Sequence, residues 1–339
     1  MQATKANILK FFVFLGLGIV LIWLALRNLT ETDKHSIIEA FKQANYFWIV
    51  VSSLLGILSH ISRAMRWNIL LQPLGFNPKL YNTFFAVMVG YLANFALPRL
   101  GEVSRCGVLT KYEKIPFTES FGTVIAERVI DLLCLIIIFF ATLIFQFEQL
   151  WGLTNSYILQ PLKSKLALII SNELYIIVLV LAIVFVTLSF FKLRKKTKTG
   201  IFTKITNLLK GFADGLKSVK NIKHPVLFIA HTIFIWFMYI AALYAGFYCF
   251  AETTHLGIDA GFAVLIFSTL GVIFVPGGTG ASQALVTEVL TSIFKVSFTF
   301  AFAFAWLLWT SQFLLILLLG IISLVLLPML NKNTQIKNS

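Results

Sequence analysis

Residues 90–105 read GYLANFALPRLGEVSR, an apolar stretch that ends at Pro98 and is followed at once by two arginines and a glutamate. The apolar helix expected here, 81–97, falls short of the roughly twenty residues that a helix needs to cross a bilayer core. Proline ends helices, and charges at membrane depth cost several kcal/mol unless they are paired or hydrated. The stretch therefore predicts a chain that enters a membrane partway and turns back with charge near the midplane.

The composition assigns the chain to the membrane proteins. Of its 339 residues, 58% are hydrophobic and 12% are charged, which is far from the composition of soluble globular proteins. The formal net charge of +14 comes mostly from short segments between apolar stretches, so we expect no nucleic-acid partner. The five histidines are scattered, and neither a zinc-binding motif nor a nucleotide-binding loop occurs, so we expect no metal and no cofactor.

Length and hydropathy predict an all-α polytopic membrane protein with about six full transmembrane helices. A bilayer core about 30 Å thick requires roughly twenty apolar residues per helix. A shorter amphipathic helix is expected over 34–45. The segments that meet the length requirement are 8–27, 46–70, 119–147, 170–192, 225–251 and 297–328.

Two further apolar stretches end at helix breakers. Residues 81–97 end at PRLG (98–101), and residues 259–275 end at PGGTG (276–280). A short, partly apolar, helix-like piece follows each break. We expect each pair to form a re-entrant helical hairpin, because neither half is long enough to cross the bilayer alone.

The order of these elements occurs twice within a single membrane domain, 1–339. From the start of the second span to the first break is 52 residues, and from the start of the fifth span to the second break is 51. The layout predicts two inverted-topology repeats, 8–147 and 170–328. Interrupted helices at matching places in inverted repeats indicate a transport site near the membrane midplane.

The segment 192–223 joins the repeats and is strongly basic. It carries ten lysines and arginines against one aspartate, and its apolar residues recur at helical spacing. We expect a cytoplasmic amphipathic linker on the membrane surface. If both hairpins turn back, the N- and C-termini also lie inside, as in a multi-pass protein of the cytoplasmic (inner) membrane.

Charged residues gather around the first break and on the two spans beside it. Arginines three apart on one span share a helix face, as do two acids four apart on another. The set comprises five arginines and three acids, so it has an excess of positive charge. Its members are Arg63, Arg66, Arg99, Glu102, Arg105, Glu127, Arg128 and Asp131.

Two interpretations of this set stay open. The carboxylates can neutralise arginines in salt bridges that hold the hairpin in place. Alternatively, the same bridges exist and the surplus guanidinium groups bind an anionic group, since a planar fork of donors suits phosphate. Arg63 and Arg66 could also extend to the inner interface.

The second break is a weaker candidate for the same site. Its glycines precede a short helix whose free N–H groups would suit an anion or a lipid headgroup. The simpler interpretation is that proline and glycine only turn the chain. The residues concerned are Pro276, Gly277, Gly278, Gly280 and Ser282.

Four stretches together resemble the membrane domain of lysylphosphatidylglycerol synthases: RAMRW (63–67), NFALPRLGEVSR (94–105), ERVID (127–131) and VPGGTGASQ (275–283). The resemblance covers about 8–328. It implies that a lipid-handling site is lined by the charged set and that a phospholipid is flipped between leaflets. The chain ends eleven residues after the last predicted span, so we do not expect the soluble aminoacyltransferase domain of the bifunctional members, and we expect no enzyme activity.

The sequence thus favours a lipid flippase that moves an anionic or aminoacylated phospholipid, or a polyprenyl-phosphate-linked lipid, between leaflets. One alternative is a non-transporting accessory or scaffold subunit for glycolipid or envelope assembly. Another is a membrane transferase in which paired carboxylates act on a lipid phosphate. Membrane lipids are the expected partners, and a homo-oligomer or a separate synthase partner stays open.

Overall fold

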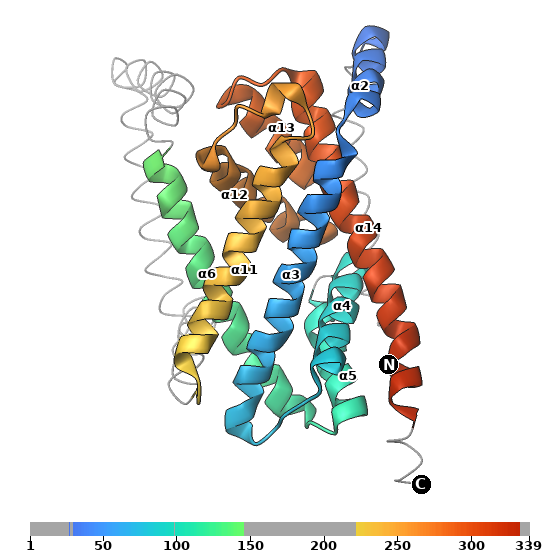
Figure 1. Cartoon of the computed structure of the whole chain (residues 1–339), viewed down its shortest axis with the longest axis vertical. Coiled ribbons are helices and arrows are strands. Elements are labelled where there is room, and N and C mark those ends of the chain that lie inside the picture. The colour runs from blue at the N-terminus through green and yellow to red at the C-terminus, as the bar shows by residue number, and fades with distance from the viewer. Residues whose placement is uncertain (1–26, 28–29, 98, 146–221, 333–339) are drawn as a thin grey trace, which may run out of the picture.

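The computed structural model describes residue 27 and residues 30–97, 99–145 and 222–332 (Figure 1). Throughout these residues the regular structure is helical and no strand occurs. The predicted spans 8–27 and 170–192 and the basic linker 192–223 lie outside the described residues, apart from Arg27, Ile222 and Lys223.

Apart from α6 and α11, which are separated by residues outside the described part, successive helices are joined by short connections that include three 3-10 turns. Among the described residues, three helical segments are long and apolar enough to cross a membrane, namely α3 with the turn after it, α11 and α14. The full count of six crossings stays a prediction. The elements are α2 (Glu31–Gln43), α3 (Tyr46–Leu71), η1 (Gln72–Leu74), α4 (Leu80–Ala96), α5 (Leu100–Glu113), α6 (Phe117–Phe145), α11 (Pro225–Phe247), η3 (Ala251–Thr253), α12 (Ile258–Phe274), η4 (Pro276–Gly278), α13 (Ala281–Ser292) and α14 (Phe298–Leu330).

Local hydrogen bonds correct two of the predicted boundaries. The amphipathic helix begins at Glu31, three residues before the predicted start, because Thr30 and Asp33 form a reciprocal capping box. The same bonds from Thr30 lower the pKa of the exposed Asp33 below its ordinary value. The span predicted to reach residue 251 ends at Phe247, because the Thr253 hydroxyl donates to the Phe247 carbonyl oxygen at 2.5 Å and completes a turn there.

The two predicted breaks produce two helical hairpins, α4 with α5 and α12 with α13, and the partners in each pack along one another. Close approach in the first depends on Gly90 and Gly101, since a methyl group on Gly101 would collide with the Gly90 carbonyl oxygen. In the second hairpin, Gly271 faces the backbone of Ser282 in the same way. Glycine at these points allows each chain to double back with its helices in contact.

The hairpins enter from opposite ends of the molecule and meet at their breaks (Figure 1). The helix order of α3–α6 recurs in α11–α14, with one hairpin in the lower half of the view and the other in the upper half. Phe95, near the end of α4, packs directly on Gly277 of η4. The Trp309 ring N–H of α14 donates to the Gly277 carbonyl oxygen at 2.7 Å. The repeat boundaries 8–147 and 170–328 include residues outside the described part and stay predictions.

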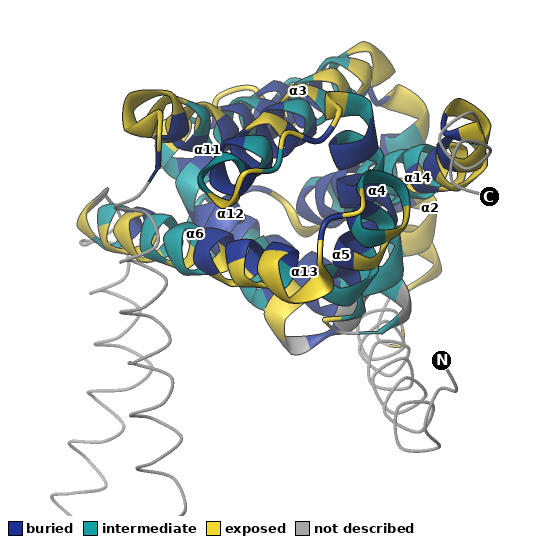
Figure 2. Cartoon of the chain, turned by 90° about the horizontal axis from the view of Figure 1, so that it is seen from below, coloured by how far each residue is buried: buried dark blue, intermediate teal, exposed yellow. Residues whose placement is uncertain are grey.

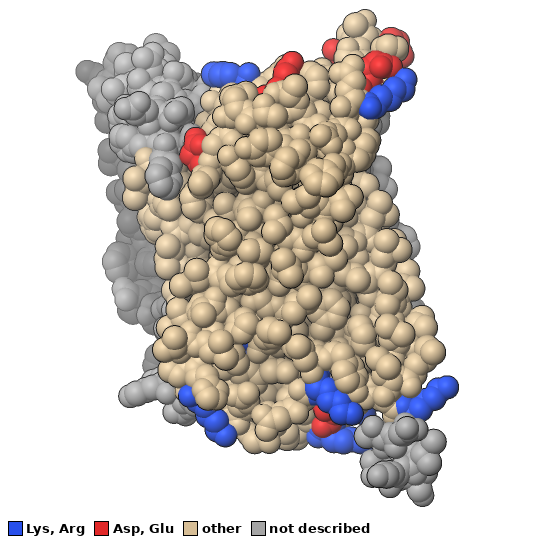
Figure 3. All heavy atoms as spheres, in the orientation of Figure 1, with Lys and Arg blue, Asp and Glu red and all other residues tan. Residues whose placement is uncertain are grey.

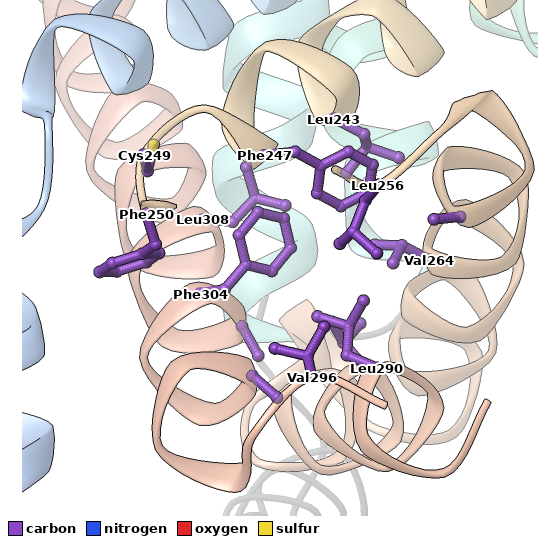
Figure 4. Packing of buried hydrophobic residues seen from close by; sticks show 14 of the residues in the cluster. Leu243, Phe247, Cys249, Phe250, Leu256, Val264, Leu290, Val296, Phe304 and Leu308 are labelled. Atoms are coloured by element: carbon purple, nitrogen blue, oxygen red, sulfur yellow. The ribbon is translucent and has the colours of Figure 1, made fainter. Parts of the chain in front are cut away.

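Two apolar clusters hold the helices together, one around each hairpin. In the cluster around α12 and α13, the rings of Phe247 and Phe304 stack with their centroids 5.2 Å apart, and Leu243, Val264 and Leu290 surround them (Figure 4). Viewed from one end, buried residues face inward and exposed ones outward on most helices (Figure 2). Exposed apolar side chains are abundant on α3, α11 and α14, as expected for helices that face lipid.

The second apolar cluster surrounds the α4–α5 hairpin and includes the fully buried side chains of Trp67, Met88 and Leu109. This apolar cluster borders the charged side chains that are described below. On the face shown in Figure 3, an uncharged band separates charged groups at the two ends. Such a band is the arrangement expected of a protein that lies across a bilayer.

Replacing Gly101 by alanine should destabilise the protein by about 1–3 kcal/mol, because the new methyl group would also lie 2.6 Å from the Asn94 side chain. Gly107→Ala is the matched control on the same helix, where the added carbon would meet nothing within 4 Å. It should be neutral or slightly stabilising. The measurement is the unfolding temperature in detergent. Equal values for the two variants would contradict the proposed close approach of α4 and α5.

Candidate functional site

Three arginines and two acids from α3, α5 and α6 form one buried cluster, which we call the ion cluster. Its members are Arg63 and Arg66 of α3, Arg105 of α5, and Glu127 and Asp131 of α6. Arg66 and Glu127 have no exposed surface, and Arg63 and Arg105 are nearly as buried. The spacings of three and four residues within α3 and α6 place the charges of each helix on one face.

Glu127 is the centre of this cluster. Its Oε1 lies 2.6 Å from Arg63 Nη1 and 3.4 Å from Arg66 Nη2. Its Oε2 lies 3.1 Å from Arg105 Nη2. A single carboxylate therefore contacts three guanidinium groups and ties α6 to both α3 and α5.

Asp131 completes the arrangement one turn further along α6. Its two oxygens divide between the α3 arginines, with Oδ2 2.7 Å from Arg63 Nη1 and Oδ1 2.6 Å from Arg66 Nη2. Two neutral side chains of α11 also accept hydrogen bonds from these arginines. Arg63 Nη2 donates to the Tyr239 hydroxyl at 3.2 Å, and Arg66 Nη1 donates to the Thr232 hydroxyl at 3.2 Å.

Aromatic rings cover the flat faces of two guanidinium groups. Arg105 lies over the Trp67 ring at 4.6 Å, and Arg66 lies over the Phe228 ring at 5.7 Å. The Trp67 ring is itself fixed by its N–H, which donates to the Thr123 hydroxyl at 2.9 Å. Cation–π contacts of this kind are stronger where water is excluded. The arginines are therefore held in fixed orientations.

The ion cluster is not electrically neutral. Three guanidinium groups against two carboxylates leave an excess of one positive charge. Within the described residues, the Nε atoms of Arg63, Arg66 and Arg105 have no hydrogen-bond partner. Uncompensated buried charge costs several kcal/mol, so this geometry favours the entry of one negatively charged group.

The other three predicted charged residues lie beside the cluster rather than in it. Arg128 Nη2 pairs with Glu102 Oε1 at 2.7 Å, and the Arg128 side chain is 42% exposed. Arg99 is exposed at the first break, directly before α5, with a left-handed backbone (φ 65°). No ion pair joins Arg99 to another residue of the described part of the chain.

The structure does not bring the second break into the ion cluster. Gly277, Gly278 and Gly280 all have positive φ, so the sharp turn at this break requires glycine. Pro276 begins η4. Ser282, in the first turn of α13, lies in the wall of a cavity of about 220 Å³ bounded by α3, α11, α12, α13 and α14. We call it the central cavity.

The central cavity adjoins the ion cluster through Tyr239, whose hydroxyl accepts from Arg63 and whose side chain also lines the cavity. His60, one turn before Arg63 on α3, lines it as well. The His60 side chain is buried, and neither ring nitrogen has a hydrogen-bond partner among the described residues. The cavity wall also contains Ser52 and Gln312, among mostly apolar neighbours.

Sequence analysis missed Thr232, Tyr239 and His60. Thr232 and Tyr239 are seven residues apart, two helical turns, on a mostly apolar helix, and that spacing is the signal that could have revealed them. His60 carries no such signal, because its place in the cavity depends on helices far away in the sequence. In the described residues, no three His, Cys, Asp or Glu side chains converge to hold a metal ion.

Comparison with known proteins gives a family match over most of the chain. The family described as "Lysylphosphatidylglycerol synthase TM region" matches residues 7–330. A UPF0104 membrane protein of Methanocaldococcus jannaschii is 30% identical over 133 residues, which is 38% of this chain and 37% of that protein. The match thus spans little more than a third of that relative. No solved structure matches the chain.

Replacing Glu127 by glutamine should destabilise the protein by about 3–5 kcal/mol, because three buried guanidinium groups would share one remaining carboxylate. The control is Glu119→Gln on the same helix, where the side chain is exposed and a change within about 0.5 kcal/mol is expected. Thermal unfolding in detergent measures both. If the two variants unfold at the same temperature, Glu127 does not hold the helices together.

Proposed function

We propose, from the premise that this chain belongs to the family of the lysylphosphatidylglycerol synthase TM region, that it moves a lipid with an anionic headgroup between the leaflets of a membrane. The observation that carries the proposal is the excess of one buried positive charge in the ion cluster. A passing headgroup with negative charge would neutralise it, whereas the acyl or prenyl tails would stay in the bilayer.

The route that we propose runs through the central cavity. Tyr239 contacts Arg63 on one side and the cavity on the other, so a headgroup in the cavity would lie next to the surplus charge. The walls of the central cavity come from α3, α11, α12, α13 and α14. The two breaks meet beside this cavity. Movement of one hairpin against the other would change access from the two membrane faces.

The proposal includes a membrane topology for the chain. Both hairpins are re-entrant, six helices cross the bilayer, and both termini lie in the cytoplasm. Lysine-rich segments on the cytoplasmic side would then fix the orientation in the inner membrane. In this proposal the chain is a transporter rather than an enzyme, and the lipid class includes anionic or aminoacylated phospholipids and polyprenyl-phosphate-linked lipids.

One observation favours a second candidate, a non-transporting scaffold subunit. Every arginine of the ion cluster already contacts a carboxylate, as expected if the cluster only holds the helices together. A transferase is less favoured, since Glu127 and Asp131 are both engaged by arginines and neither is free to accept a proton from a substrate.

Reconstitution separates these candidates. The purified protein in liposomes with fluorescent anionic lipids should increase the fraction of label that external dithionite can quench, relative to empty liposomes. If no anionic lipid tried gives quenching above that of empty liposomes, transport is refuted and the scaffold is favoured. Turnover of a lipid-phosphate donor in detergent would instead indicate a transferase.

Arg99→Gln should lower movement of anionic lipid by roughly tenfold, because it removes an exposed positive charge at the first break. The unfolding temperature should not change, because this guanidinium pairs with no other described residue. Arg99→Lys should retain most of the movement, since it keeps the charge. Lys111→Gln, which removes an exposed charge on α5, the helix that follows Arg99, is the control and should behave as the unmodified protein. Unchanged movement in Arg99→Gln would remove Arg99 from the proposed site.

Arg105→Lys tests the fork geometry within the cluster. The variant should fold, because a cation remains beside Glu127, but it should move lipid more slowly, because an ammonium group cannot keep both contacts of the guanidinium with that carboxylate. The rate of dithionite quenching measures the effect. Full activity would show that the planar fork of Arg105 is not required.

A further inference from the structure

A second cavity lies on the α13–α14 side of the molecule, separate from the ion cluster, and we call it the α13–α14 cavity. Its volume is about 150 Å³. Its walls come from the α13 helix and from the first half of α14. None of its lining residues belongs to the charged set around the first break.

One wall of this cavity is aromatic. Phe298, Phe302 and Trp306 follow one another at intervals of four residues, so their rings lie along one face of α14. Successive ring centroids are 5.7 Å and 5.9 Å apart. Because all three rings come from one helix, they form a continuous wall rather than a cage around a ligand.

The opposite wall is polar. Gln283, Thr287 and Thr291 are also four residues apart, on α13, and Glu288 lies beside them with its side chain exposed. Gln283 is 98% buried, as its exposed fraction is 2%, yet neither atom of its side-chain amide has a hydrogen-bond partner among the described residues. The ring N–H of Trp306 is also buried without one. Such groups cost free energy unless a bound molecule supplies the missing bonds.

These groups define which ligand chemistry would suit the cavity. The amide nitrogen of Gln283 and the ring nitrogen of Trp306 need acceptors, whereas the amide oxygen of Gln283 needs a donor. A hydroxyl group serves as both. The Glu288 carboxylate, which already accepts from the Ser292 hydroxyl, is a further acceptor at the exposed edge of the cavity. An ammonium ion has no acceptor, and an anion would be repelled by Glu288, the charged residue of the lining.

The aromatic wall adds a second requirement. A ligand must present a weakly polar face to the rings and polar groups to the facing wall. A pyranose ring does so, because its C–H groups lie on its faces and its hydroxyls project from its edge. We propose that the α13–α14 cavity binds one sugar ring, either a free sugar or the headgroup of a glycolipid.

This inference goes beyond the proposed function and does not depend on it, because it concerns binding and not lipid movement. In Figure 1, α13 and the first part of α14 lie in the upper half of the molecule, and the α4–α5 hairpin lies in the lower half. A sugar bound there would be spatially separate from the ion cluster. The ion cluster takes Arg105 from the first hairpin, whereas the polar wall of the proposed sugar site comes from α13 of the second.

Direct binding tests the proposal. The full-length protein is purified in a sulfobetaine detergent, because alkyl glycosides would occupy the site, and transferred to phosphatidylcholine nanodiscs. Saturation-transfer NMR with methyl α- and β-hexopyranosides probes free sugars. Native mass spectrometry of nanodiscs that contain monohexosyl diacylglycerol, with diacylglycerol as the comparison, probes the headgroup. Binding of the glycosides indicates a free-sugar site, and binding of the glycolipid alone indicates a headgroup site.

Gln283→Leu should weaken binding by on the order of tenfold, since it removes the amide and keeps the approximate volume. Trp306→Phe keeps a ring and removes the N–H, so it should weaken binding less than Trp306→Leu, which removes the ring as well. Gln72→Leu is the matched control, because its side-chain oxygen is likewise buried without a partner but lies on η1, outside this cavity.

Three results would overturn the proposal. The first is that neither the glycosides nor the glycolipid binds, which would mean that the cavity holds only water. The second is that diacylglycerol or phosphatidylcholine is retained as well as the glycolipid, which would indicate a tail or ammonium site. The third is that Gln283→Leu and Gln72→Leu bind sugar equally, with unfolding temperatures showing that both variants are folded.

Discussion

The Glu127 carboxylate is fully buried and contacts three guanidinium groups, so α3, α5 and α6 cannot separate without exposing charge to an apolar surrounding. Apolar packing is a weak force between helices that face lipid, because lipid tails are as apolar as the side chains. In that setting the ion cluster holds the helices together, as a hydrophobic core does for a protein in water. It also carries an excess of one positive charge, and that excess is the basis of the anion site that we propose.

The glycines at the hairpins allow this cluster to exist. Arg105 reaches Glu127 only because α5 turns back along α4, and that return needs Gly101 against the Gly90 carbonyl oxygen. At the second break the positive φ of three glycines gives the turn that carries Gly277 onto Phe95. The backbone geometry at the breaks, the ion pairs of Glu127 and the position of the central cavity are therefore linked. A substitution that alters one of them should alter the other two.

The two cavities differ in chemistry although α13 and α14 contribute to the walls of both. The central cavity lies next to surplus positive charge through Tyr239 and is lined by His60, whose ring nitrogens have no hydrogen-bond partner within the described part of the chain. The α13–α14 cavity has an acid at its edge, a buried amide and an aromatic wall. A lipid whose headgroup carries both a phosphate and a sugar would match both, although each site is argued from its own contacts.

The sequence by itself determined the membrane class, the places of the breaks and the identity of the charged residues, because apolar length, proline, glycine and intramembrane charge are local properties. It left open whether the charges pair or bind a ligand. Only the tertiary structure decided that Arg63, Arg66 and Arg105 share Glu127 and Asp131 and that Arg99 stays apart. It also decided that Ser282, just after the second break, lines the central cavity instead. Those outcomes depend on which helices face each other across the molecule. Tyr239 and Thr232 of α11, for example, lie more than 160 residues from their partners on α3. Local pattern fixes what a residue can do, and packing between distant segments fixes which partner it finds.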